Sequence, residues 1–325
     1  MKRGRKNNLK RKKDKIREIA VVISIVILIF LFCFLLKSFL NDAYHEGYSQ
    51  TNLSYSSPGY IKDDIKTISN LEYSNVNSPP LLLDLYLPLN SSFKKLPVII
   101  LVHGGGWDGG MKEDLSSVAL EVAKHGYATV SVDYSWSSKS KFPKQIEDLN
   151  ASVLWIKQHA EEYNLDKEKI GLIGFSAGGH LASLLAVQSR DIKAVVSCWG
   201  PQNLKTLILQ CDKSIYCINN TQLLKEITLM FLGCDITSDN VTCINLAKQA
   251  SPQYHINQIK TTTSFLLIHG DKDEIVPINQ SIDFNNVLKQ RGIDSTLIIK
   301  ENLSHGNIND ASIDTIDKFF KEKLS

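Results

Sequence analysis

Short runs of branched apolar residues alternate along most of the chain with longer segments in which apolar residues recur every three to four positions. The runs are typical of buried strands and the longer segments of amphipathic helices. We predict strands at residues 65–76, 81–87, 97–102, 127–132, up to 175, 192–199, 265–269 and 295–299. We predict helices at residues 115–125, 143–163, from 177 onward, 279–291 and 311–323. The alternation indicates an α/β fold with a mostly parallel eight-stranded sheet, helices on both faces and an antiparallel hairpin at one edge.

Residues 202–250 interrupt this alternation. They contain no clean strand pattern and include four of the six cysteines, namely Cys211, Cys217, Cys234 and Cys243. An insertion after the strand at 192–199 starts where a cap over the carboxyl edge of the sheet would start, so we predict a cap; a surface elaboration far from any site is the alternative. Local disulfides Cys211–Cys217 and Cys234–Cys243 fit an exported domain, although three pairings are possible and free thiols are the alternative.

The first forty residues differ from the rest in charge and hydropathy. Residues 2–17 carry ten Lys or Arg and one acid, and residues 19–36 are apolar apart from Ser24 and Cys33. A helix of 18 residues spans about 27 Å, which is enough to cross the hydrocarbon core of a bilayer. A cleaved signal peptide is the alternative, but it would have a shorter apolar region and a small-x-small cleavage site, which residues 36–40 lack.

This pattern predicts a single-pass membrane protein whose folded domain lies on the extracytoplasmic side, because basic flanks stay in the cytoplasm. We expect a basic cytoplasmic tail at residues 1–18, a transmembrane anchor at 19–40, a linker at 41–64 and the folded domain at 65–325. Beyond residue 17, the chain carries 27 basic and 33 acidic residues, so the excess of basic residues is confined to the tail. We therefore expect no nucleic-acid partner. No spacing of Cys and His matches a zinc site, and we expect no metal.

The sequence G-F-S-A-G at residues 174–178 lies between a predicted strand and a predicted helix. In this context a G-x-S-x-G motif makes a sharp, strained turn that exposes the serine hydroxyl at the edge of the sheet. Serine is a weak nucleophile unless a general base takes its proton and an acid orients that base. Ser176 is therefore the candidate nucleophile.

Candidate partners for Ser176 follow the strands predicted at 265–269 and 295–299, in the order acid, then histidine. His305 is the candidate base, and Asp273 the candidate acid that fixes its tautomer. Asp271 is the alternative acid, but it follows Gly270 directly at the strand end, where a carboxylate usually bonds local backbone amides. We expect Glu274 to be a solvated loop charge.

The sequence H-G-G-G-W at residues 103–107 follows the predicted strand at 97–102. Glycine backbones there can direct N–H groups at the serine, so Gly105 and Gly106, with the amide of Ala177, are the candidate oxyanion hole. A phosphate loop is the alternative, but it would continue with Lys and Ser or Thr, and Trp107-Asp108 does not.

Trp107 and Trp199 end strands near this site, and they are candidates for the substrate pocket or for ordinary core packing. We expect His103 to brace the glycine loop, His180 to pack or cap, and His269 to be a structural residue at a strand end.

Together these residues resemble an esterase of the α/β-hydrolase superfamily, in the hormone-sensitive-lipase-like and bacterial feruloyl-esterase-like group. The resemblance runs from about residue 82 to the C-terminus. It rests on the motifs at 83–88 (L-D-L-Y-L-P), 103–107, 142–148 (F-P…I-E-D), 174–180 (G-F-S-A-G-G-H), 269–277 (H-G-D…D…V-P) and 304–306 (S-H-G). It implies hydrolysis of carboxylic esters, often short-chain or aryl esters, through an acyl-enzyme and without cofactor or metal.

One loop departs from the group. After Asp133-Tyr134 the relatives commonly continue R-L-A-P-E, whereas this chain has S-W-S-S-K. That loop borders the pocket in relatives, so the resemblance implies the catalytic residues more strongly than the substrate. We predict a membrane-anchored serine esterase with the triad Ser176, Asp273 and His305 that acts on a small-molecule or glycan-linked ester. The alternatives are a serine peptidase of the same fold and a non-catalytic binding protein on this scaffold.

Overall fold

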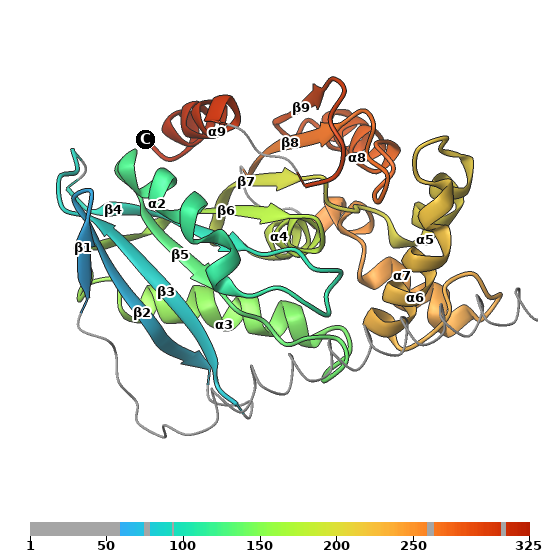
Figure 1. The fold of residues 1–325 in the computed structure, drawn as a ribbon, viewed down its shortest axis with the longest axis horizontal. Helices are drawn as coiled ribbons and strands as arrows, with labels where there is room; N and C mark the ends of the chain where they lie inside the picture. Colours follow the sequence, from blue (N-terminus) through green and yellow to red (C-terminus); the bar gives the residue numbers. More distant parts are fainter. Residues whose placement is uncertain (1–58, 75–78, 93, 259–262, 307–309) are drawn as a thin grey trace, which may run out of the picture. The chain divides into compact units, whose positions relative to one another are not determined.

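The strands between residues 60 and 300 form a single sheet in the computed structural model (Figure 1). The structure describes residues 59–325 except 75–78, 93, 259–262 and 307–309. The strands are β1 (Tyr60–Lys62), β2 (Ile65–Ser74), β3 (Leu81–Pro88), β4 (Leu96–Val102), β5 (Ala128–Val132), β6 (Leu165–Phe175), β7 (Ile192–Cys198), β8 (Ser264–Gly270) and β9 (Ser295–Lys300). Their order across the sheet is β1-β2-β3-β5-β4-β6-β7-β8-β9.

The sheet is antiparallel from β1 through β3 to β5 and parallel from β5 to β9. This is the predicted mostly parallel sheet with an antiparallel hairpin at one edge, but it has nine strands in the described residues, where we predicted eight. The extra strand, β1, lies within the predicted linker at 41–64. It is three residues long and all three residues are exposed, so no alternation of apolar and polar residues marks it in the sequence.

The central strands are apolar throughout because both faces of the sheet are covered. In β4, Val98, Ile100 and Val102 enter one core, while Ile99 and Leu101 enter the other. Helices α2 (Ser116–Lys124) and α9 (Asp310–Lys323) pack on the second face. Helices α3 (Lys144–Gln158), α4 (Ala177–Gln188) and α8 (Asn279–Gln290) pack on the first, as Figure 1 shows.

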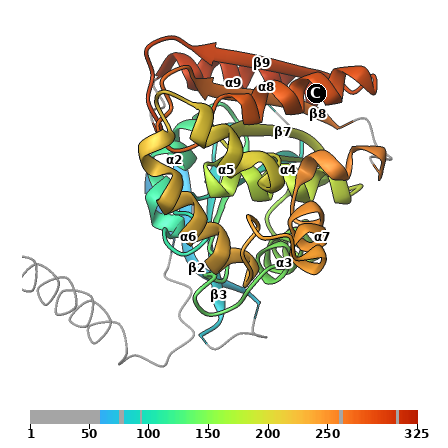
Figure 2. The same cartoon turned by 90° about the vertical axis from the view of Figure 1, so that its right-hand side faces the viewer.

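The segment at 202–250 folds into three helices, α5 (Leu204–Lys213), α6 (Thr221–Leu232) and α7 (Val241–Gln249). These helices lie together beyond the carboxyl ends of β6 and β7, on the right of Figure 1, and they face the viewer in Figure 2. We call this group the cap. It is held by two disulfides, Cys211–Cys217 and Cys234–Cys243, which are the local pairs that fit an exported domain.

A buried cluster of charges fixes the chain just after the H-G-G-G-W segment. The Lys112 side chain, only 2% exposed, lies 3.0 Å from Asp84 Oδ1 and also pairs with Glu113. The Lys112 amide donates to Asp133 Oδ1 at 2.8 Å. Burial raises the pKa of Asp133 to about 6, despite its bonds to Lys112. The cluster joins the short helix η1 (Lys112–Leu115) to β3 and to the end of β5, so the glycine loop leads into a fixed element.

Among the residues that the structure describes, no helix is both long and apolar enough to cross a membrane. The predicted tail at 1–18 and anchor at 19–40 lie outside the described residues, as does the linker up to residue 58.

Candidate active site

Ser176 lies at the sharp turn between β6 and α4, with φ 53° and ψ −118°. This left-handed φ is strained for a residue with a side chain, and such strain is concentrated at functional sites. The neighbouring glycines are required by close backbone contacts. A Cβ at Gly178 would lie 2.1 Å from the Val102 carbonyl oxygen, and one at Gly174 would lie 2.2 Å from that of Gly178. The strand therefore turns into the helix with the Ser176 side chain at the carboxyl edge of the sheet.

His305 lies between Ser176 and Asp273. Its Nε2 is 2.9 Å from Ser176 Oγ, and its Nδ1 is 2.8 Å from Asp273 Oδ2 and 3.0 Å from Oδ1. With Nδ1–H donating to the carboxylate, Nε2 is free to accept the serine proton. The three side chains come from the loops that follow β6, β8 and β9, which lie on the parallel side of the sheet with β7 between β6 and β8.

The carboxylate of Asp273 is buried and fully engaged. Its Oδ1 accepts the amides of Ile275 and Val276 at 2.9 and 2.8 Å, and its Oδ2 lies 3.1 Å from His269 Nε2. Burial alone would raise the pKa of Asp273, but the hydrogen bonds from His269 and His305 outweigh it and hold the pKa well below its usual value. Asp273 therefore stays ionised beside His305 at neutral pH.

The other carboxylates of this loop have different surroundings. Asp271, the alternative acid, donates its amide to the Lys300 carbonyl, and among the described residues its carboxylate makes no hydrogen bond to His305, whose Nδ1 bonds Asp273. Glu274 is half-buried, and its Oε2 accepts the amide of His305 at 3.2 Å. The expectation that Glu274 is a solvated charge was wrong. Nothing in the sequence shows that this carboxylate would reach the backbone of a loop 31 residues away.

The glycine loop passes directly beside the nucleophile. A Cβ at Gly104 would lie 3.1 Å from the Phe175 carbonyl oxygen and 3.3 Å from Ser176 Cβ, so a side chain there would crowd the nucleophile. Gly105 and Gly106 follow with φ of 110° and 59°, and they line the same cavity as Ser176. Ala177 is the first residue of α4, so its amide belongs to the N–H groups that a helix leaves unpaired at its start. The candidate oxyanion donors are thus next to Ser176.

Trp107 braces this loop and does not line the cavity. It has φ 63° and is 1% exposed, and its ring stacks on Phe231 of the cap with centroids 4.5 Å apart. Its Nε1–H donates to His180 Nδ1 at 3.1 Å, and His180 Nε2 in turn contacts the Ala250 carbonyl at 2.5 Å. Burial lowers the pKa of His180 to about 4, although the bond to Ala250 opposes this, so the imidazole is neutral at pH 7. We predicted Trp107 as a residue of the substrate pocket or of the core, and the structure places it in the core.

Two further histidines have the structural surroundings that we expected. His103 donates through Nδ1 to the Gly104 carbonyl at 2.8 Å and stacks on Tyr134. Burial lowers its pKa to about 4 against the effect of that bond. His269 lies at the end of β8 and receives the Ser281 hydroxyl on Nδ1 at 2.7 Å, which leaves Nε2–H to face Asp273.

A cavity of about 670 Å³ opens above Ser176. Trp199 lines it, as predicted for the pocket, with its ring centroid 6.0 Å from that of His305. Its other walls are mostly apolar and include Leu115, Val118, Phe175, Leu223, Ile227 and Ile275. Leu223 and Ile227 come from α6, so the cap forms one wall of the cavity. Among the described residues, no group of three or more His, Cys, Asp or Glu is arranged to hold a metal ion.

The fold and this arrangement define an α/β hydrolase with a serine site. The profile of the BD-FAE family matches residues 83–288, and the chain belongs to this family. The resemblance to the hormone-sensitive-lipase-like esterase group is confirmed.

The chain is 28% identical over 201 residues to Esterase LipQ of Mycobacterium tuberculosis, covering 61% of this chain and 47% of LipQ. It is 25% identical over 263 residues to the probable isoprenylcysteine alpha-carbonyl methylesterase ICMEL1 of Arabidopsis thaliana, covering 74% of this chain and 52% of that protein. The chain thus spans about half the length of these curated relatives. Esterase B of Lactobacillus rhamnosis, solved in an inhibited form, shares the fold with a TM-score of 0.68 and 20% identity over 90% of this chain and 96% of its own.

The contacts of the two aspartates give a direct test of the acid. We expect Asp273→Asn to slow phosphonylation of Ser176 by a fluorophosphonate probe about a hundredfold or more, because loss of the acid leaves the imidazole in the wrong tautomer. Asp271→Asn is the matched control and should react at close to the wild-type rate. Labelling rates followed by gel fluorescence measure both. A larger loss in Asp271→Asn than in Asp273→Asn would reverse the assignment.

Proposed function

We propose that the chain is a serine carboxylesterase that hydrolyses esters with apolar groups through an acyl-enzyme on Ser176. The observation that carries the proposal is the unbroken line of hydrogen bonds from Ser176 Oγ through His305 to a buried, ionised Asp273, with Ser176 and His305 lining an apolar cavity. Both curated relatives described above are named as esterases or methylesterases, which supports the same reaction class.

In the acylation step, Ser176 Oγ attacks the ester carbonyl carbon while its proton passes to His305 Nε2. The carbonyl oxygen becomes an oxyanion, and the amides of Gly105, Gly106 and Ala177 are the groups that would stabilise it. The tetrahedral intermediate then breaks its bond to the alcohol oxygen, which receives the proton from His305. Asp273 keeps its negative charge throughout and stabilises the imidazolium.

In the deacylation step, His305 removes a proton from water, and the resulting hydroxide attacks the acyl carbonyl. The second tetrahedral intermediate releases the carboxylic acid, and the proton returns from His305 to Ser176. All proton transfers thus pass through one imidazole nitrogen, Nε2. This is possible because Nδ1–H remains bonded to Asp273 at 2.8 Å.

The apolar cavity favours an ester whose acyl or alcohol part is hydrophobic, and it is large enough for a small-molecule ester or an ester group carried on a glycan. We propose that residues 19–36 anchor the enzyme in a membrane with the domain on the extracytoplasmic side. The length and apolar character of that segment and its basic flank support this placement. The two disulfides of the cap also support it, because disulfides persist in oxidising compartments.

Hydrolysis of p-nitrophenyl acetate, butyrate and octanoate by the full chain, purified in detergent, tests the reaction class. We expect turnover of at least one ester, and Ser176→Ala should lose about a thousandfold or more of it because the acyl-enzyme cannot form. Equal rates for wild type and Ser176→Ala on every ester would contradict the proposal. Turnover of an aminoacyl anilide without ester turnover would indicate the peptidase alternative, and no turnover of either would favour a binding protein.

The position of Ile227 predicts that the cap limits the size of the substrate. Ile227 packs on Gly106 of the glycine loop, where a Cβ would lie 3.5 Å from Ile227 Cδ1. We expect Ile227→Ala to raise the ratio of kcat/KM for octanoate over butyrate about tenfold, because the shorter side chain leaves room for a longer acyl chain. Accommodating such methylene groups in an apolar pocket changes the binding free energy of the transition state by about one to three kcal/mol. Met230→Ala, on the same helix but 38% exposed, is the control and should leave this ratio unchanged. An unchanged ratio in Ile227→Ala would show that the cap does not set the chain length.

A further inference from the structure

Glu274 connects the acid loop to the histidine loop independently of the triad itself. Its Oε2 accepts the amide of His305 at 3.2 Å, whereas the His305 side chain bonds to Asp273, the preceding residue. The two loops are also joined through their backbones, because the Lys272 amide donates to the Leu303 carbonyl at 3.1 Å. Glu274 therefore holds the backbone of the residue whose side chain must meet both Ser176 and Asp273.

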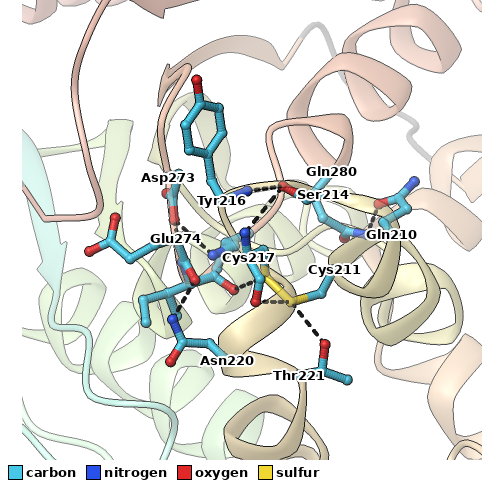
Figure 3. The surroundings of a disulfide bond; sticks show 12 residues. Gln210, Cys211, Ser214, Tyr216, Cys217, Asn220, Thr221, Asp273, Glu274 and Gln280 are labelled. Atoms are coloured by element: carbon cyan, nitrogen blue, oxygen red, sulfur yellow. Dashed lines mark hydrogen bonds between the residues drawn. A yellow bond between two sulfur atoms is a disulfide. The ribbon is translucent and has the colours of Figure 1, made fainter.

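Asn220 connects the same loop to the cap. It occupies the N-cap position of α6, where a side chain usually accepts a backbone amide of the first helical turn, yet its side chain makes no such bond. Instead, its Nδ2 donates to the Glu274 carbonyl oxygen at 2.8 Å (Figure 3). An N-cap side chain that bonds a distant loop, and not its own helix, indicates that the distant contact has a function in the structure.

The Cys211–Cys217 disulfide holds Asn220 in place. The short helix η2 (Ile218–Asn220) follows Cys217 directly, and the Asn220 amide donates to the Cys217 carbonyl at 2.7 Å. The sulfur of Cys217 lies 3.2 Å from the carbonyl oxygen of Ile275, the residue after Glu274. Both cysteines are fully buried, and Figure 3 shows the disulfide next to the loop that carries Asp273 and Glu274.

We propose that Glu274 and Asn220 are positioning residues of the esterase reaction, with Asn220 fixing the acid loop to the cap and Glu274 fixing the histidine loop to the acid loop. The expected effect on kcat rests on the proposed function, whereas the expected effect on the position of His305 rests on the contacts alone. The imidazole of His305 needs correct distances on both sides at once, 2.9 Å to Ser176 and 2.8 Å to Asp273. A displacement of about 1 Å from such a geometry can cost about a hundredfold in rate.

Kinetics of the full chain with p-nitrophenyl butyrate test the proposal through the separation of kcat from KM. We expect Glu274→Ala to lower kcat by about ten- to a hundredfold with KM within about twofold, because Glu274 acts on the chemical step and not on the cavity. Glu274→Gln should restore most of kcat, since its amide oxygen can accept the same His305 N–H. Asn220→Ala should lower kcat less, because the turn of Asp273 with Ile275 and Val276 remains.

The matched controls are Glu301→Ala and Asn219→Ala. Glu301 is an exposed acid on the loop of His305, and Asn219 is the exposed neighbour of Asn220. Both should keep the wild-type kcat. The double variant Glu274→Ala/Asn220→Ala should lose less than the product of the two single losses, because both residues act through the acid loop. Urea unfolding of each variant separates a positioning effect from lost stability.

A spectroscopic readout makes the inference testable even if the proposed function fails. The His305 Nδ1 proton in its bond to Asp273 should give a downfield proton resonance in the wild type, identified by its absence in His305→Gln. We expect this resonance to weaken or disappear in Glu274→Ala and to return in Glu274→Gln. Absence of ester turnover in the wild type would contradict the proposed function and leave this comparison to decide the inference.

Three results would overturn the positioning role. They are a kcat for Glu274→Ala equal to that of Glu301→Ala, a Glu274→Gln variant as impaired as Glu274→Ala, and a His305 resonance unchanged in Glu274→Ala. If Glu274→Ala does not fold, the comparison of Asn220→Ala with Asn219→Ala decides the same question for the cap. Equal kcat and equal His305 resonances in that pair would exclude a contribution from the cap.

Discussion

The arrangement of the chain around Ser176 depends on one imidazole that must make two hydrogen bonds in opposite directions. His305 reaches Ser176 at 2.9 Å and Asp273 at 2.8 Å, and neither bond is useful without the other. The three residues lie on loops that are far apart in sequence. Parallel strands solve this problem because their carboxyl ends meet at one edge of the sheet, where β6, β8 and β9 deliver the three loops. The covered faces of the sheet then keep these strands fixed.

Around this line of hydrogen bonds, two groups of contacts hold the backbone of the surrounding loops in place. The glycine loop and Trp107 have positive φ, and the ring of Trp107 is held between Phe231 of the cap and His180 of α4. The acid and histidine loops are held by Glu274 and, through Asn220, by the cap. Thus the cap does more than form a wall of the cavity, since it contacts both Trp107 of the glycine loop and Glu274 of the acid loop. Strain of this kind persists only where the surrounding packing over-determines it.

Local patterns in the sequence predicted the parts that depend on local chemistry. Ser176 was predicted from its strand-turn-helix context, and Asp273 and His305 from their order after later strands. The structure brings these three residues together. The parallel sheet was predicted from the alternation of strand-like and helix-like hydrophobic periods along the chain. The missed features depend on contacts between distant segments. β1 is exposed and, among the described strands, pairs only with β2. Trp107 is buried against a cap helix, and Glu274 reaches a loop that no sequence pattern joins to it. The period of apolar residues predicts which face of a helix or strand is buried, but it does not predict which other segment packs against that face.

The central claim is that Ser176 carries the acyl group during turnover, and the most direct measurement is the mass of the enzyme itself. The full chain would be mixed with p-nitrophenyl butyrate, quenched in acid within the first turnovers and digested for mass spectrometry. The account predicts one butyryl group on the peptide that contains Ser176, and none on that peptide in Ser176→Ala. A butyryl group on any other residue during productive turnover, or turnover of the wild type with no acylated peptide at any quench time, would contradict it.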